Sequence, residues 1–322
     1  MSSIAGRAPV CVIYNPSAGT AERIEELRDL LARDGRIELC GTEHAGHGGQ
    51  LAESAVADAR KVIIAAGGDG TVSEIVAGLM DARQVHPASP LPALLIAPMG
   101  TGNDLVRTLG LPDTLEENLA LLDEGELRPL DVFHWTLTSP DGVPPKQGWG
   151  VNVINGGFSA KLREALTPEL KKRWGPLAYA RAALGSVGEL DPHRLTFRVD
   201  DGGEQVTEAI NVVVANARFA GGGIEVAPQA DPFDGLLELV VILPGNFLDM
   251  AEVTTKLLVG DVDDSANTFH VTARRFTLSA TPPIPFNIDG DLVGEGILSV
   301  EVVPAALQVL VPRRRAQGND AA

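Results

Sequence analysis

The sequence has few cysteines, few aromatic side chains and a shortage of basic side chains, and each shortage excludes a class of protein. Two cysteines, Cys11 and Cys40, cannot build a disulfide framework or a cysteine-rich zinc site, so we expect small buried side chains in a reducing compartment. Lys and Arg number 26 against 43 Asp and Glu, and the formal net charge of −17 disfavours binding to nucleic acid.

Long hydrophobic runs are also missing. No uncharged apolar stretch reaches the roughly 18 residues that a membrane span requires. The N-terminal residues lead directly into a strand-like run at 10–14 and do not resemble a signal peptide. We therefore expect a cytoplasmic protein.

The 322 residues, 44% of them hydrophobic, are enough for two domains of about 150 residues each. Residues 8–131 alternate two patterns. Residues 62–66 form a continuous apolar run, and residues 71–80 place Val72, Ile75 and Leu79 on one helical face. Strands that alternate with helices predict an α/β domain whose parallel sheet is covered on both faces.

Residues 132–312 show a different sequence pattern. Short β-rich runs separated by turns predict an antiparallel β-sandwich. A helical insertion is expected near 159–184, and 313–322 read as a tail. The expected strands of this second domain are 132–138, 195–200, 209–215, 236–243, 271–278, 297–303 and 307–311.

Three glycine-bearing loops follow predicted strands of the first domain. Glycine lets the backbone approach a phosphate, and each loop opens a helix whose N-terminus favours an anion. Because the carboxyl ends of parallel strands share one edge of the sheet, the loops should converge. Strand-to-helix turns also use glycine for purely structural reasons. The loops are Asn15-Pro16-Ser17-Ala18-Gly19-Thr20, Gly67-Gly68-Asp69-Gly70-Thr71 and Gly100-Thr101-Gly102-Asn103-Asp104.

Two of these loops contain a carboxylate, Asp69 and Asp104. A bare carboxylate would repel a bound phosphate. A cation between the two removes the conflict, and Mg²⁺ is the usual partner of nucleotide phosphates. The alternative is that both residues cap helices.

The loop sequences resemble the diacylglycerol kinase catalytic domain family, which includes bacterial lipid kinases and sphingosine kinases and is related to NAD kinases. The matching motifs are the second loop with Glu74, the third loop, Asn15-Pro16 with Gly19, and Thr42 followed by His47-Gly48. The resemblance implies an NAD kinase/diacylglycerol kinase-like first domain that binds ATP. The ATP-binding residues it implies are Asn15, Gly19, Thr42, Gly67, Gly68, Gly70, Thr71, Glu74, Gly100, Thr101, Asn103 and Asp104.

The resemblance continues through the second domain, in 221–223, 227–231, Asp234-Gly235 and 289–291. It implies that Asp289 is the catalytic base and that Asp69 acts with it in catalysis. It also implies that Asp231 and Asp234 hold a structural Mg²⁺, with Asp291 as a supporting or Mg²⁺-binding carboxylate. A solvated turn is the alternative for Asp231 and Asp234. The alternative for 289–291 is a hairpin turn, for which Asp-Gly is a strong signal.

Two positions depart from the family pattern. Thr20 stands near the place where bacterial members carry a Lys, and Arg23, one turn further along, is either a phosphate ligand or a solvated helix residue. The acidic residue of the last motif is shortened from Glu to Asp291.

The substrate is expected to be a lipid. Residues 160–181 carry six basic against two acidic side chains, interleaved with Trp174 and leucines, as in elements that dock on anionic lipid. A solvated helix with one core face is the alternative. His44 and His47 do not indicate a zinc site without further ligands nearby, and the other histidines are isolated along the sequence.

Together these features predict an ATP-dependent kinase that uses Mg²⁺ to phosphorylate a hydroxyl of diacylglycerol or a related lipid. The expected partners are the lipid substrate and, transiently, a membrane surface, but no nucleic acid; a homodimer is left open. A kinase of a soluble hydroxylated metabolite and a non-catalytic nucleotide sensor remain as alternatives.

Overall fold

The computed structural model describes residues 10–18, 21–31, 37–139, 142–157 and 191–313. The helical insertion predicted near 159–184 and the basic element at 160–181 lie outside these residues, as do Gly19 and Thr20.

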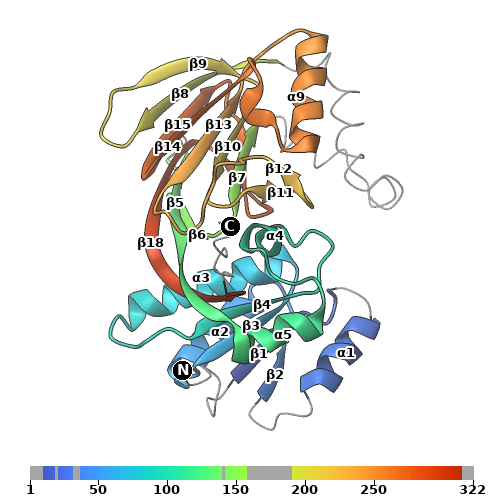
Figure 1. Ribbon diagram of the computed structural model, residues 1–322. Coiled ribbons are helices and arrows are strands. Elements are labelled where there is room, and N and C mark those ends of the chain that lie inside the picture. Colours follow the sequence, from blue (N-terminus) through green and yellow to red (C-terminus); the bar gives the residue numbers. More distant parts are fainter. Residues whose placement is uncertain (1–9, 19–20, 32–36, 140–141, 158–190, 314–322) are drawn as a thin grey trace, which may run out of the picture.

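The first domain is a parallel sheet in the order β2-β1-β3-β4 with helices packed against it (Figure 1). Every residue of β3 and β4 is buried, which explains their continuous apolar runs. Helix α2 packs on α3, and α1 contacts α5. The strands are β1 (Val10–Tyr14), β2 (Ile37–Gly41), β3 (Val62–Gly67) and β4 (Ala93–Pro98); the helices are α1 (Ala21–Leu31), α2 (His47–Ala57), α3 (Asp69–Val85), α4 (Asp104–Leu109) and α5 (Leu115–Glu124).

Two long strands, β5 (Glu126–Thr138) and β18 (Ile297–Val311), join this sheet to the second domain. They pair with each other along most of their length, and Val309 of β18 lies beside Leu94 of β4. One ten-stranded sheet therefore runs through both domains, and the predicted division at 131/132 falls inside β5.

The second domain is an antiparallel sandwich. The ten-stranded sheet supplies one layer, and a six-stranded sheet in the order β14-β13-β10-β7-β16-β17 supplies the other. Phe133, Phe276 and Phe286 are fully buried between the layers. The strands are β6 (Lys146–Gly150), β7 (Val153–Gly157), β8 (His193–Val199), β9 (Gln205–Ala209), β10 (Asn211–Ala215), β13 (Leu237–Ile242), β14 (Thr268–Ala273), β15 (Arg275–Thr281), β16 (Pro285–Ile288) and β17 (Asp291–Glu295).

The outer face of the six-stranded sheet is covered by smaller elements. Met250 and Val253 of α9 (Phe247–Val259) pack on Ile210, and Ala220, Ala227 and Ala230 pack on Val240 and its neighbours. The remaining elements here are β11 (Phe219–Ala220), β12 (Ile224–Glu225) and the short 3-10 helix η2 (Val262–Asp264).

The predicted fold class, an α/β domain followed by an antiparallel sandwich, is confirmed. Three strand predictions are wrong in detail. The expected strand 209–215 covers the end of β9 and all of β10, and 271–278 covers parts of β14 and β15, which belong to different sheets. Residues 297–303 and 307–311, by contrast, are a single strand, β18. The register shifts between Val303 and Leu307, where Ala305 has a positive φ of 51°, so the chain continues through an irregularity that looked like a break. No helix among the described residues has the length and apolar character needed to cross a membrane.

Candidate active site

Two of the glycine loops meet at the carboxyl ends of β3 and β4. A Cβ on Gly100 would lie 2.6 Å from the Cα of Gly68, so the close approach of the two backbones requires glycine there. The Asp69 carboxylate accepts a 2.7 Å hydrogen bond from the Asp104 amide of the third loop. The structure therefore brings these loops together at one edge of the sheet.

The side chains around these loops fix their shape. Asn103, in a left-handed conformation, accepts a hydrogen bond from the Gly100 amide at 3.1 Å and donates one to the Gly100 carbonyl at 2.9 Å. Thr71 packs so tightly against Gly67 that a Cβ there would lie 2.4 Å from it. Gly70 and Thr101 are exposed. The backbone at these last two positions is therefore open to solvent, and that at Gly68 is partly so.

The Asp104 carboxylate is hydrogen-bonded to the second domain. Its side chain is 5% exposed and accepts hydrogen bonds from the Gly222 amide at 3.1 Å and the Gly223 amide at 2.7 Å. Burial, and then the charge of Asp69, raises the pKa of this carboxyl, and the two amides act in the opposite direction. Asp104 thus fastens α4 to the turn between β11 and β12 of the second domain.

Glu74 also has a positioning role. Its two carboxylate oxygens accept the Gly46 amide at 2.8 Å and the Gly48 amide at 3.1 Å, which fixes the turn that opens α2. Asn15 accepts the Ser17 amide at 2.8 Å and so shapes the first loop, while the Thr42 amide donates to the Tyr14 carbonyl.

Arg23 contacts the segment between α4 and α5. Its guanidinium donates to the carbonyl of Asp113 at 3.0 Å. The structure thus ties this side chain to the segment that precedes α5.

Asp289 connects the two domains. One of its oxygens accepts the Asn152 and Val153 amides at 3.0 and 2.9 Å; the other accepts the Val151 amide at 2.8 Å and the Ser73 hydroxyl at 3.2 Å. Burial raises the pKa of this carboxyl to about 6, although all four hydrogen bonds favour its ionised form. Ser73 lies one helical turn after Asp69 on α3, so the Asp289 carboxylate stands close to the second glycine loop.

The turn between β16 and β17 explains why Asp289 is followed by a glycine. Asp289 and Gly290 both have positive φ between β16 and β17, as a tight Asp-Gly hairpin requires. Asp291 is the first residue of β17 and is exposed. The hairpin and the proton-acceptor interpretations of this motif are therefore compatible.

Asp231 and Asp234 lie beside a third carboxylate, Asp131 on β5. Asp131 is 2% exposed and accepts the Gly235 and Ala305 amides, each at 2.7 Å. Burial raises the pKa values of Asp131 and Asp234, and the charge of Asp231 raises both further. Sequence analysis missed Asp131; a lone charge within the apolar run of β5 is the signal that could have found it. Asp291 is on a different element, β17.

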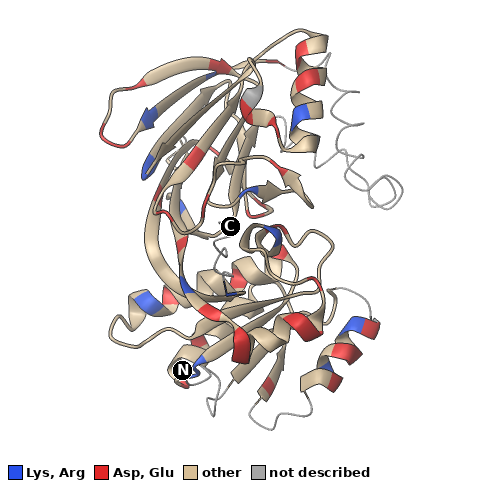
Figure 2. Cartoon of the chain, viewed as in Figure 1, with Lys and Arg blue, Asp and Glu red and all other residues tan. Residues whose placement is uncertain are grey.

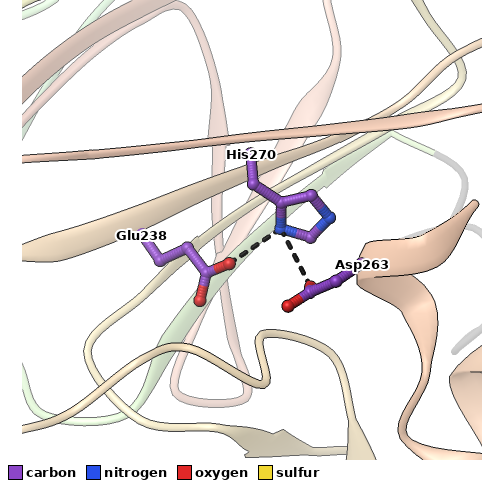
Figure 3. A group of neighbouring side chains, drawn as sticks. All are labelled: Glu238, Asp263 and His270. Carbon is purple, nitrogen blue, oxygen red and sulfur yellow. Dashed lines mark hydrogen bonds and ion pairs between the residues drawn. The ribbon is translucent and has the colours of Figure 1, made fainter.

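The structure also assembles a group that the sequence did not suggest. Glu238, Asp263 and His270 bring three ligand atoms within 4.8 Å of one another (Figure 3). His270 looks isolated in the sequence because Glu238 of β13 and Asp263 of η2 are 32 and 7 residues away from it along the chain. β13 pairs with β14 so that Val240 is directly opposite His270. Glu238, two residues before Val240, therefore lies beside the imidazole.

Comparison with known proteins places this geometry in a family. Residues 9–135 match the model of the diacylglycerol kinase catalytic domain, and residues 152–311 match the YegS C-terminal NAD kinase beta sandwich-like domain. A protein of Xanthomonas oryzae named probable lipid kinase YegS-like is 30% identical over 305 residues, which cover 94% of this chain and 95% of that protein. A protein of the same name from Cronobacter sakazakii is 31% identical over 302 residues, with the same coverage.

Solved structures support the fold. A diacylglycerol kinase from Bacillus anthracis aligns with a TM-score of 0.68 at 21% identity, over 94% of this chain and 97% of that one. The yeast NADH kinase aligns with a TM-score of 0.51 at 11% identity, over 95% of this chain and 84% of that one. The predicted resemblance and the kinase class are confirmed: the chain belongs to the diacylglycerol kinase catalytic domain family, among the YegS-like lipid kinases.

Proposed function

We propose that this protein transfers the γ-phosphoryl group of ATP to a hydroxyl of diacylglycerol or a related lipid, as a step of phospholipid metabolism. The observation that carries the proposal is the position of Asp289: its carboxylate contacts Ser73, one turn from Asp69, at the junction of the two domains. An acidic group is thereby held beside the convergent glycine loops, as phosphoryl transfer to an alcohol requires.

The nucleotide phosphates are proposed to bind at the start of α3 and the third loop. Gly68, Gly70, Gly100 and Thr101 offer backbone groups there, and the first amides of α3 point toward an anion. Gly67, Thr71, Glu74 and Asn103 act by shaping these loops. We place Asn15 and Thr42 on the side of the nucleotide away from the γ-phosphate. Gly19 lies outside the described residues, and its role stays a prediction from the sequence.

The carboxylates of the site suit Mg²⁺. Asp231 and Asp234 each use one oxygen to accept a backbone amide, and their mutual repulsion with Asp131 is the kind that a hard cation relieves. We propose that Asp231 and Asp234 hold a structural ion, that Asp69 holds a phosphate-bound ion, and that Asp291 supports the latter. When bound, Mg²⁺ neutralises charge on the phosphates.

Asp289 is proposed to receive the proton of the lipid hydroxyl. An ionised carboxylate offers about four lone-pair positions, and the structure fills all of them. The Ser73 hydroxyl is the longest of these contacts, and it comes from a side chain rather than from the backbone. We propose that the lipid hydroxyl takes the place of the Ser73 hydroxyl on Asp289.

A membrane surface is proposed to deliver the lipid, with α9 as one contact. Phe247 and Leu248, at the start of this helix, are 59% and 74% exposed, whereas Met250 and Val253 are buried against the sheet. The helix carries Asp249 and Glu252 against one basic residue, Lys256 (Figure 2), so its contact would depend on apolar insertion rather than on basic charge.

Replacing both Phe247 and Leu248 with serine is therefore expected to weaken binding to neutral phosphatidylcholine vesicles at least about tenfold, because two exposed apolar side chains no longer enter the lipid. The capping residues Asn246 and Asp249 are retained, so the helix should persist. The measurement is co-flotation with vesicles. Val85→Ser, at a 70% exposed position on α3, is the matched control. Equal binding by the double variant and the wild type would remove α9 from the proposed contact.

The direct test of function is to incubate the protein with labelled ATP, Mg²⁺ and a total lipid extract, and to identify the labelled product by mass spectrometry. A phosphorylated lipid that is absent with the Asp69→Asn variant is the expected result. A labelled water-soluble product would indicate a metabolite kinase. ATP binding without turnover across a broad lipid panel would indicate a nucleotide sensor.

A further inference from the structure

We propose that Glu238, Asp263 and His270 form a binding site for a divalent transition metal ion of the Zn²⁺ class. The three residues come from β13, η2 and β14, on the outer face of the six-stranded sheet (Figure 3). The site is separate from the Asp231 and Asp234 pair and does not depend on the proposed kinase function.

The imidazole stands between the two carboxylates. His270 Nδ1 lies 2.7 Å from Glu238 Oε1 and 3.3 Å from Asp263 Oδ1. A separation of about 3.3 Å is the edge of a tetrahedron with metal–ligand bonds of about 2.0–2.1 Å. The shorter contact is a hydrogen bond, which an ion entering between the two atoms would replace.

Two buried carboxylate oxygens of this group, Glu238 Oε2 and Asp263 Oδ1, have no hydrogen-bond partner among the described residues. His270 Nε2 also has none there, but this nitrogen points away from both carboxylates (Figure 3). Glu238 is 1% exposed, and a buried carboxylate with an unpaired oxygen is costly in a folded protein. The contacts within ion-pair distance that Glu238 and Asp263 make in the described residues both go to His270, and they are ion pairs only when the imidazole is protonated. With a neutral imidazole, the group carries two negative charges, which a divalent ion balances.

The ligand types select the metal. One imidazole with two carboxylates suits Zn²⁺ or its neighbours better than Mg²⁺ or Ca²⁺, which prefer all-oxygen sites. Gln229 donates a 2.8 Å hydrogen bond to Asp263 Oδ2 and so orients Oδ1 toward the imidazole, as residues around metal ligands commonly do. The Asp263 side chain is 27% exposed, which gives an ion a path from solvent and leaves a coordination position for water.

The position of the site gives the ion a structural consequence. Asp263 is on η2, which follows and contacts α9, whereas Glu238 and His270 are on adjacent strands. An ion held by all three fastens the α9–η2 segment to the sheet. Removing it should loosen this segment first.

The test uses the full chain, with Zn²⁺ and Co²⁺ as probes. After dialysis against a chelator, the protein is expected to take up one equivalent of Zn²⁺ at this site, to melt at a higher temperature as free Zn²⁺ increases, and to develop a visible Co²⁺ spectrum. His270→Gln and Asp263→Asn should each weaken this binding more than about 100-fold, and Gln229→Ala about tenfold. Asp263→Asn, at a partly exposed position, keeps the test valid if a variant at a more buried position fails to fold.

Two controls separate this site from others. The variant with both His44 and His47 replaced by glutamine removes a stacked surface pair that could bind Zn²⁺ adventitiously, and Asp231→Asn alters the proposed Mg²⁺ site. Both should leave the equivalent at Glu238, Asp263 and His270 intact. Zn²⁺ uptake that persists in Asp263→Asn and His270→Gln, or that is lost with the His44 and His47 variant, overturns the proposal. So does failure of the wild type to bind either probe.

Discussion

Replacing Asp289 with asparagine is expected to lower kcat about 10²–10⁴-fold, the contribution typical of a positioned general base. The substitution keeps the size of the side chain and removes its ability to take a proton. Nucleotide affinity should hardly change, because Asp289 belongs to the second domain and the glycine loops to the first. The measurement is kcat at saturating ATP and lipid, with ATP affinity determined separately by titration.

The pH dependence makes this prediction specific to Asp289. Burial raises the pKa of its carboxyl to about 6, so the base is ionised only above that pH. The kcat of the wild type should therefore rise as the pH passes through about 6 and then level off. The residual activity of Asp289→Asn should lack this rise.

The free energy of unfolding should change in the opposite direction from kcat and fall as the pH rises. Because the pKa of Asp289 in the folded protein is above its ordinary value of 3.8, the folded state holds the proton more tightly than the unfolded chain. Its favourable contribution is fully present below pH 3.8 and is lost as the pH rises through about 6. Chemical denaturation of wild type and Asp289→Asn across this range measures the difference between them.

Two neighbouring variants serve as controls. Asp291→Asn should reduce kcat less, because its exposed carboxylate is proposed only to support the ion that Asp69 holds. Ser73→Ala removes the hydroxyl that the lipid is proposed to displace, so kcat should be largely retained. A loss of kcat below about threefold for Asp289→Asn would reject it as the base, since that is far under the usual contribution. An equal loss of ATP affinity would make it a structural residue.

The parts of the site that follow from local patterns were predictable. Each glycine loop stands between an apolar run and a helical pattern, and parallel strands place such loops at one edge, where Gly68 and Gly100 meet. What the loop side chains contact was not predictable. Asp104 is 118 residues from Gly222, and Asp289 is 216 residues from Ser73. The sequence shows that these residues are polar and lie within motifs. Only the fold determines which partner each side chain contacts.

The same limit explains why the sequence suggested two strands at 297–303 and 307–311 and did not suggest the group of Glu238, Asp263 and His270. Pro304 and Ala305 interrupt an apolar run, which looks like a turn; the strand passes through because the Ala305 amide binds the buried Asp131 carboxylate. Glu238 and His270 stand on strands β13 and β14, where every second side chain points into the core of the sandwich. An isolated acid or histidine on such a strand becomes a ligand group only through the pairing of its neighbours.

Asp69 and Asp104 provide the second test with a large expected effect, because they differ in role despite their similar settings. Asp69→Asn is expected to reduce kcat/KM for ATP by at least about 10²–10³-fold, since it removes the charge proposed to hold the metal-bound phosphate. Its amide oxygen can still accept the Asp104 amide, so the melting temperature should stay close to that of the wild type. Turnover and thermal melting of the same preparation measure both quantities.

Asp104→Ala should show the reverse pattern. It leaves the Gly222 and Gly223 amides without their acceptor, which is expected to cost about 1–3 kcal/mol of unfolding free energy and to speed hydrogen exchange in that turn. Turnover should fall only to the extent that the weaker contact between the two domains disturbs the active site. If Asp104→Ala instead abolishes turnover while stability and exchange stay unchanged, its carboxylate acts on the nucleotide. In that case the contact with the second domain must open when ATP binds.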